Sequence, residues 1–217
     1  MDNNEYIILS KDLQELSKKI PLNWGEVQNN RTDSKINMFN FSNKEQLEKA
    51  IIDLDENDKV YFRRRWFLWQ CSRVDEYLFY KASNVNKNPN SKDQNWDIEF
   101  NSNSKLRFDI KGTVVPKGMR KNFKISDEKK IIDFYYNNQS KGVRFNIQNR
   151  LFIVHHSFYK TERSMYLRCH WKLKEKAYEN FGKSISEKTN FTSFKTAISK
   201  CIFIIESENN EFSFQIN

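Results

Sequence analysis

The fold is decided by the stretch NWDIEF at residues 95–100, followed by the polar NSNS at 101–104 and by KLRFDIKGT at 105–113. In the first and third pieces apolar residues alternate with charged ones, which is typical of strands that are buried on one face. The four polar residues between them have the composition of a turn. The stretch therefore predicts a β-hairpin with its charges gathered on one side.

Pairing within this hairpin would bring three charged residues together. Because neighbouring strands pair across the ladder, Asp97 can approach Asp109 and Lys111. Two carboxylates suit a hard divalent cation such as Mg²⁺, which prefers oxygen ligands and is often shared with substrate phosphates. An ammonium beside a metal-bound water favours hydroxide and stabilises charge on a phosphoryl group under attack. These residue types point to phosphodiester hydrolysis.

The same residues resemble the centre of the PD-(D/E)XK nuclease superfamily, which has the restriction-endonuclease-like fold. In that superfamily an Asp at the start of one strand and an acid two residues before a Lys in the next strand form the metal and catalytic centre, commonly with a Glu from a preceding helix. The matching positions here are Asp97, Asp109, Lys111 and Glu76. Trp96 stands where the family name has Pro. The resemblance implies that all four residues are catalytic and that the three acids hold Mg²⁺ or Mn²⁺.

The third acid is the least determined of the set. On the helix expected over residues 58–82, Glu76 follows Trp69 by seven positions and so lies near the apolar face. A metal would give this carboxylate a partner, but an ion pair with Arg73 or a nearby Lys is an equal alternative. Asp75 and Glu99 are the other candidates for the metal shell.

An acid two residues before a Lys is a common pattern, and it also begins at Asp33, Asp127 and Glu128. Asp33 lies in a polar loop, whereas Asp127 and Glu128 open a helix, where acids favour the helix dipole. An ordinary amphipathic hairpin with its charges facing water is therefore the alternative interpretation. The flanking elements favour the nuclease core.

Those elements are predicted from periodicity and capping signals. Helices are expected over residues 10–19, 42–55 behind a capping box at Ser42, 58–82, 126–138 and 159–183, and strands over 149–157, 201–206 and 211–216. This order resembles the nuclease core and predicts an α/β fold of mixed (α+β) type, with a central mixed β-sheet flanked by helices. We expect residues 1–42 to be an N-terminal helical addition, with a mobile loop or linker at 28–35, and residues 43–217 to be the nuclease-like domain.

The charge distribution indicates a polyanionic partner. The net charge is +9, but residues 1–56 carry 7 basic and 11 acidic side chains, so the basic excess lies in the remainder, which contains the hairpin. A Lys-rich surface that only confers solubility is the alternative. The residues predicted to contact nucleic-acid phosphates are Arg64, Lys117, Arg120, Lys121, Lys124 and Arg144.

Three further side chains are candidates for auxiliary roles. Gln139 and Gln148 follow the predicted catalytic strand and could orient a water or touch the nucleic acid. His155 could line the site, although a core or surface histidine is the safer interpretation. Its neighbour His156 would point to the opposite face of the strand, so the two are poorly placed to chelate one ion.

Other classes of chemistry are poorly represented. With 5 Gly the chain has no phosphate-cradling glycine loop and no dinucleotide-binding fingerprint. The cysteines Cys71, Cys169 and Cys201 are widely spaced, so we expect reduced thiols and no zinc site. The sequence shows neither a signal peptide nor an apolar run of membrane-spanning length, and we therefore expect a soluble cytoplasmic protein with no membrane contact.

Together these features predict an Mg²⁺-dependent endonuclease that acts on double-stranded DNA. The resemblance further implies a role in restriction, in defence against foreign DNA or in mobile-element processing, and a homodimer that cuts both strands. One alternative is a binding or assembly subunit of the same fold that does not cut. Another is an RNA-directed nuclease or binder, suggested by interleaved aromatic and Arg residues at 61–70.

Overall fold

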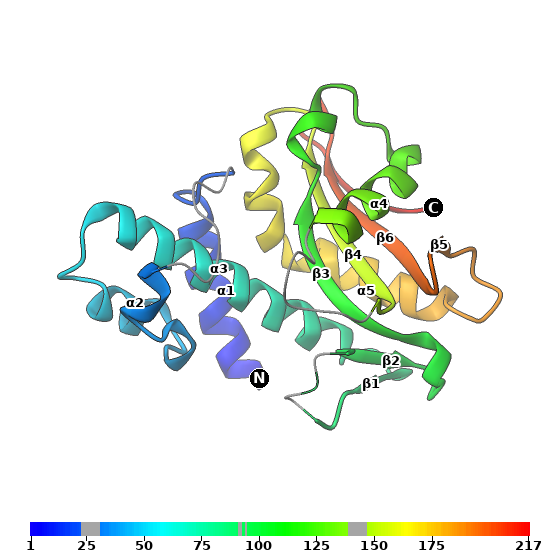
Figure 1. The fold of residues 1–217 in the computed structure, drawn as a ribbon, viewed down its shortest axis with the longest axis horizontal. Coiled ribbons are helices and arrows are strands. Elements are labelled where there is room, and N and C mark those ends of the chain that lie inside the picture. Colours follow the sequence, from blue (N-terminus) through cyan, green and yellow to red (C-terminus); the bar gives the residue numbers. More distant parts are fainter. Residues whose placement is uncertain (23–30, 91–92, 94, 139–146) are drawn as a thin grey trace.

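The computed structural model describes residues 1–22, 31–90, 93, 95–138 and 147–217. Within them the chain forms a mixed α/β structure, a seven-stranded sheet flanked by helices (Figure 1). The helices are α1 (Asn3–Ser17), α2 (Lys44–Ala50), α3 (Glu56–Phe79), α4 (Glu128–Asn138) and α5 (Trp171–Ser184). The strands are β1 (Val85–Lys87), β2 (Ile98–Phe100), β3 (Arg107–Val114), β4 (Arg150–Ser157), β5 (Thr192–Phe194), β6 (Ala197–Glu206) and β7 (Phe212–Ile216).

The sheet is mixed, as the element order predicts. Its strands follow the order β1-β2-β3-β4-β6-β5, and β7 also pairs with β6. Strand β2 is antiparallel to both β1 and β3, whereas β3, β4 and β6 run parallel to one another. The predicted hairpin is present, with Ile98 opposite Phe108. Its turn is tightened by Asn101 and Ser102, which both have positive φ.

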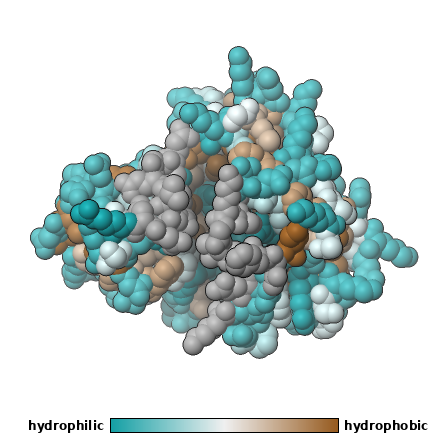
Figure 2. Space-filling model, viewed as in Figure 1, coloured by the Kyte–Doolittle hydropathy of each residue, from teal (hydrophilic) through white to brown (hydrophobic). Residues whose placement is uncertain are grey.

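Two apolar clusters cover the two faces of the sheet. On one face α3, α5 and α1 pack against Phe108, Ile110 and the other residues of the larger cluster. On the opposite face α4 covers Phe152 and its neighbours. Strand β4 is buried along its whole length, as predicted, because alternate residues enter the two clusters. On the outer face of the molecule that Figure 2 shows, hydrophilic side chains cover most of the described surface.

The N-terminal part shares the core of α3. Leu9, Leu13 and Leu16 of α1 are buried in the larger cluster together with Trp66. The Trp66 indole also donates a hydrogen bond to the carbonyl of Phe41, at 2.8 Å. Figure 1 shows α1, α2 and the first half of α3 to one side of the sheet. Residues before 43 therefore contribute to one continuous core with α3.

The predicted helix starts near the N-terminus were wrong. Helix α1 begins at Asn3, and its cap is Asp2, which accepts a hydrogen bond from the Glu5 N–H at 2.8 Å. Ser10 lies inside this helix rather than before it. Helix α2 is capped by Asn43, because the Asn43 side chain accepts from the backbone at the start of the helix.

The expected long helix over residues 159–183 is divided. Short 3-10 turns at Thr161–Ser164 and Tyr166–Cys169 precede α5. Side chains in the first turn bond to the ends of β4 and β6: Ser164 accepts from the Ser157 N–H, and Arg163 pairs with Glu206 at 2.5 Å. These contacts stabilise the turns more than the sequence pattern favours a continuous helix, because helix propensity is weak compared with tertiary interactions.

The expected mobile loop at residues 28–35 is anchored where it is described. Residues 28–30 lie outside the described part of the chain, and Arg31–Ser34 forms a 3-10 turn. Asp33 accepts a hydrogen bond from the Tyr61 hydroxyl at 3.0 Å and pairs with Arg65.

Among the described helices, none combines the length and the apolar character needed to cross a bilayer.

Candidate functional site

The candidate site lies at the edge of β3, where its pairing with β2 ends. Asp97 immediately precedes β2, and its backbone N–H donates to the carbonyl of Phe108 at 2.9 Å. Its carboxylate accepts the next amide on the same edge of β3, that of Ile110, at 2.7 Å. The side chain of Asp97 therefore continues the ladder for one step beyond the last residue of β2.

Asp109 and Lys111 lie two residues apart on β3 and point to the same face, as the hairpin pattern predicts. The Lys111 ammonium nitrogen is 2.6 Å from a carboxylate oxygen of Asp109. Lys111 is half-buried, whereas Asp109 is 2 % exposed. The two residues thus form an ion pair that is sheltered from water.

The structure brings Asp97 close to Asp109. The pKa of Asp97 is raised to about 6, first by burial and then by the negative charge of Asp109. The Lys111 ammonium and the Ile110 amide act in the opposite direction but do not cancel these effects. Like charges held near each other make ionisation of both costly unless a cation is added.

Glu76 of α3 lies near Asp97. The hydroxyl of Tyr80 lies 3.4 Å from both a Glu76 carboxylate oxygen and the backbone carbonyl of Asp97. The pKa of Glu76 is raised to about 7, by burial and then by the charge of Asp97. The alternative ion pair with Arg73 is not formed, because Arg73 bonds instead to Glu5, at 2.6 Å.

The alternative third acids have other partners. Asp75 is buried, forms an ion pair with Lys174 and accepts a hydrogen bond from the Tyr178 hydroxyl at 2.7 Å. Glu99 pairs with Arg107 at 2.6 Å. Of the three candidates, Glu76 is the acid whose charge is coupled to Asp97.

Arg150 is a site residue that sequence reasoning missed. It faces Asp109 across the parallel β3–β4 pairing, is 3 % exposed, and its Nε lies 3.7 Å from the second carboxylate oxygen of Asp109. Its guanidinium lies over the Tyr136 ring, 4.7 Å from the centroid. Asp109 is therefore held between two cations, Lys111 and Arg150.

The donor set suits a hard cation in chemistry, although its present geometry is not that of a metal cage. In the described part of the chain, no three His, Cys, Asp or Glu side chains lie together closely enough to hold an ion. Burial first, and then the charge of a neighbouring carboxylate, raises the pKa values of Asp97 and Glu76, so a bound cation would offset the excess of negative charge that arises when both ionise. Carboxylate oxygens with that excess are what Mg²⁺ prefers, and it needs only one or two of them with water and phosphate.

Side chains also close the remainder of this edge of β3. Two residues beyond Ile110, the carbonyl of Gly112 accepts a hydrogen bond from the Arg168 guanidinium at 3.1 Å. The carbonyl of Val114 accepts from the Tyr135 hydroxyl. The edge is thereby protected from pairing with another strand, and no sequence motif indicated Arg168 for this role.

The predicted phosphate-contacting residues divide into two groups. Lys117, Lys121 and Lys124 are exposed on and beside the 3-10 turn that follows β3. Arg120 in the same turn is half-buried and donates to the carbonyl of Val115 at 2.8 Å. Arg64 is only 7 % exposed and donates to the carbonyl of Leu22, so it does not belong to the exposed set.

The auxiliary candidates lie in different places. The Gln148 amide donates to the Asn95 side chain at 2.9 Å, which ties it to the segment that carries Asp97. His155 is fully buried, its Nδ1 donates to the carbonyl of Thr113, and burial lowers its pKa well below the usual value, so it is a neutral core residue. Gln139 and Arg144 lie outside the described residues.

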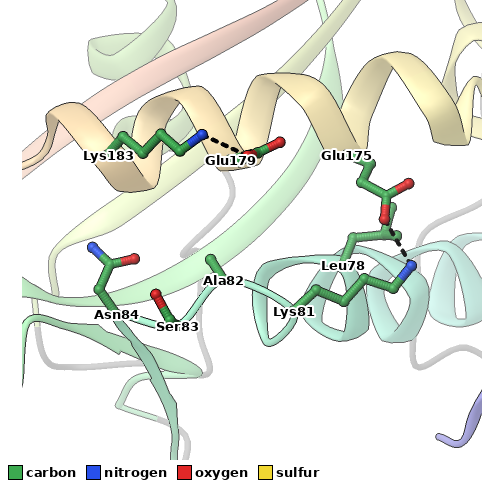
Figure 3. A pocket seen from close by; sticks show the side chains of 8 residues that line it. All are labelled: Leu78, Lys81, Ala82, Ser83, Asn84, Glu175, Glu179 and Lys183. Atoms are coloured by element: carbon green, nitrogen blue, oxygen red, sulfur yellow. Dashed lines mark hydrogen bonds and ion pairs between the residues drawn. The ribbon is translucent and has the colours of Figure 1, made fainter.

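A separate pocket of about 370 Å³ lies between the end of α3 and α5 (Figure 3). Its charged side chains neutralise one another, since Lys81 pairs with Glu175 at 2.7 Å and Lys183 with Glu179 at 2.5 Å. None of the three site acids lines it. This pocket is therefore separate from the candidate site at the edge of β3.

Comparison of the chain with protein-family models, with curated proteins and with solved structures finds no match.

Proposed function

We propose that the chain is a metal-dependent endonuclease that hydrolyses phosphodiester bonds of DNA. One observation carries the proposal: the half-buried Asp97 lies close enough to the buried Asp109 for the charge of Asp109 to add to burial in raising the pKa of Asp97, and Lys111 contacts Asp109. Perturbed carboxylates beside an ammonium are common at catalytic sites. The order of elements around them resembles the restriction-endonuclease-like core, which we propose as the fold.

The proposed roles follow from the side chains. Asp97, Asp109 and Glu76 would hold Mg²⁺ or Mn²⁺, which supplies a bound water of lowered pKa and neutralises charge on the phosphate. Lys111 would donate hydrogen bonds to the attacked phosphate or to the attacking water and stabilise the charge that develops there. Arg150 would hold the carboxylate of Asp109 in place from the far side.

The substrate is proposed from the charge around the site. Lys117, Lys121 and Lys124 follow the catalytic strand and are exposed, so they can contact phosphates on either side of the cut. We propose double-stranded DNA as the partner, a homodimer for cutting both strands, and a cytoplasmic role in defence against foreign DNA or in mobile-element processing. Light scattering of the protein on DNA tests the dimer.

The test is cleavage of plasmid DNA with and without Mg²⁺ by the wild-type protein and by Asp109→Asn and Lys111→Met. We expect nicking or linearisation that requires Mg²⁺ and falls at least about 100-fold in both variants, as loss of metal ligands and charge stabilisers does elsewhere. The matched controls are Asp133→Asn and Lys129→Met, which break an exposed ion pair of the same chemistry at 2.6 Å. Activity that survives Asp109→Asn would place the centre elsewhere.

A second candidate is a nucleic-acid-binding or assembly subunit that does not cut. It is favoured by the two cations at Asp109, because an acid neutralised by Lys111 and Arg150 can serve structure alone. It predicts salt-sensitive DNA binding without Mg²⁺-dependent turnover. The RNA alternative gains no support from its aromatics, since Tyr61 and Trp66 are buried in the core.

A further inference from the structure

A second pocket, of about 360 Å³, adjoins the candidate site on the side of Glu76. Its volume falls within the range of roughly 300–1,000 Å³ that is usual for small-ligand pockets. Both Glu76 and Tyr80 line it, and the Tyr80 hydroxyl lies 3.4 Å from the backbone carbonyl of Asp97, so the pocket adjoins the acids at the edge of β3 through these two residues. The residues that line it are Met1, Arg73, Glu76, Tyr77, Tyr80, Lys81 and Lys87.

Tyrosine rings and ammonium groups form the walls of this pocket. The Tyr77 ring packs on the Tyr6 ring, with 5.1 Å between the centroids. The Lys81 nitrogen lies 5.1 Å from the centroid of Tyr6 and 5.4 Å from that of Tyr77. The Lys87 nitrogen lies 5.6 Å from the ring centroid of Tyr80. Flat aromatic faces are thus interleaved with positive charge.

The lysines of this wall differ in how firmly they are held. Lys81 reaches across to Glu175 of α5, as Figure 3 shows, at 2.7 Å. Lys87 is exposed and makes no ion pair with any residue in the described part of the chain, and its charge is felt by Glu76. Lys87 is therefore able to contact a phosphate that approaches Glu76.

Stacking faces beside cations are the chemistry by which proteins bind single-stranded nucleic acid without reading its sequence. A base within a continuous duplex keeps both faces stacked on its neighbours, so it cannot enter such a pocket without being extruded. Building on the proposed nuclease function, we propose that the pocket receives an unpaired nucleotide next to the cut phosphate. The preferred substrate is then DNA with a single-stranded tail, flap or frayed end beside the cleavage site.

The test is a binding assay that does not depend on cleavage. Fluorescence anisotropy with full-length Asp109→Asn compares a blunt DNA duplex with the same duplex carrying a single-stranded tail, at one fixed salt concentration. We expect the tailed DNA to bind more tightly. Adding Tyr77→Ala should weaken tailed DNA by about tenfold, the usual loss for one stacked base, and leave blunt DNA nearly unchanged.

Two further variants separate stacking from folding. Tyr77→Phe retains a ring and should keep the preference for tailed DNA, whereas Lys87→Gln removes one exposed cation and should weaken tailed DNA about two- to fivefold with an unchanged melting temperature. The proposal would be overturned if the wild-type pocket bound both DNAs equally well, or if Tyr77→Ala lost the same affinity for both DNAs. The plasmid assay measures cleavage independently of binding. A preference for tailed DNA without cleavage would therefore refute the proposed nuclease activity but not the nucleotide-binding pocket.

Discussion

The carboxylate of Asp97 accepts a hydrogen bond from the backbone amide of Ile110 at 2.7 Å, and this contact links the end of a strand to the chemistry of the site. Because β2 pairs with β3 for only two residues, the Ile110 amide would otherwise face an open edge. The carboxylate that satisfies it is also the one whose pKa is raised, first by burial and then by the charge of Asp109. The fold thus positions one acid of the site through a backbone bond.

Asp97 accepts the hydrogen bond of the Ile110 amide and also carries a titratable charge, and the contribution of the charge to stability can be measured by varying pH. Its folded pKa of about 6 lies above its unfolded value of about 4, so the folded state holds the proton longer as pH rises. The free energy of unfolding of the metal-free protein should therefore decrease as the pH is raised from about 4 to about 6. Asp97→Asn removes the charge but keeps an oxygen acceptor, and we expect its melting temperature at about pH 8 to exceed that of wild type by roughly 2–4 °C.

Asp97→Ala is the matched comparison. It removes the charge together with the acceptor of the Ile110 amide, and an unpaired amide costs about 1–3 kcal/mol. We expect it to be less stable than Asp97→Asn at every pH in thermal melts. Equal stability of the two variants would show that the hydrogen bond contributes nothing.

Mg²⁺ should act on the same titration. Glu76 has a pKa of about 7, and Asp97 of about 6, so both carry protons in the folded state at about pH 5 and lose them by about pH 8. Because metal ligands must be deprotonated, we expect Mg²⁺ to raise the melting temperature more at pH 8 than at pH 5. The increase should be lost in Asp109→Asn and retained in Asp133→Asn, and its removal by a chelator completes the test.

Gly112 is required by the side chain that closes the strand edge. A Cβ on this residue would lie 2.9 Å from the Arg168 guanidinium, which is buried and bonded to the Gly112 carbonyl. We expect Gly112→Ala to lower the free energy of unfolding by about 1–3 kcal/mol in urea. At Gly118 a Cβ meets nothing within 4 Å, so Gly118→Ala should change stability by less than about 1 kcal/mol.

The sequence predicted the parts of the fold that depend on local patterns. Alternation gave the hairpin, and the uninterrupted apolar run gave the doubly buried β4. The prediction of one helix over residues 159–183 was wrong because Arg163 bonds to Glu206, 43 residues further along the chain, and Ser164 bonds to the backbone at the end of β4. Local periodicity contains no information about those partners.

The same limit explains the site. The hairpin register places Asp97 beside Asp109, and that register is local. Arg150 reaches Asp109 only through parallel pairing of β3 with β4, which is a long-range contact that no spacing in the sequence reveals. The choice between Glu76 and Asp75 likewise depends on Lys174 of α5, which pairs with Asp75 from 99 residues further along the chain.

That buried pair lies beside Gly112 of β3 and gives a last prediction. Lys174 is 0 % exposed, pairs with Asp75 and donates to the backbone carbonyl of Arg168 at 3.0 Å. Lys174→Met removes the cation that pairs with the buried Asp75, which should cost about 3–5 kcal/mol of unfolding free energy in urea. Lys183→Met breaks an exposed pair and should cost less than about 1 kcal/mol.

A double variant decides whether the loss comes from the charge or from the packing of Lys174. Asp75→Asn with Lys174→Met removes both buried charges, and we expect it to recover a large part of the stability that Lys174→Met loses. Purely additive losses in the double variant would mean that the two residues are not coupled. The backbone carbonyl of Arg168 accepts a hydrogen bond from Lys174, and the Arg168 guanidinium donates one to the carbonyl of Gly112. Lys174→Met should therefore also accelerate hydrogen exchange of the Gly112 amide, whereas Lys183→Met should not.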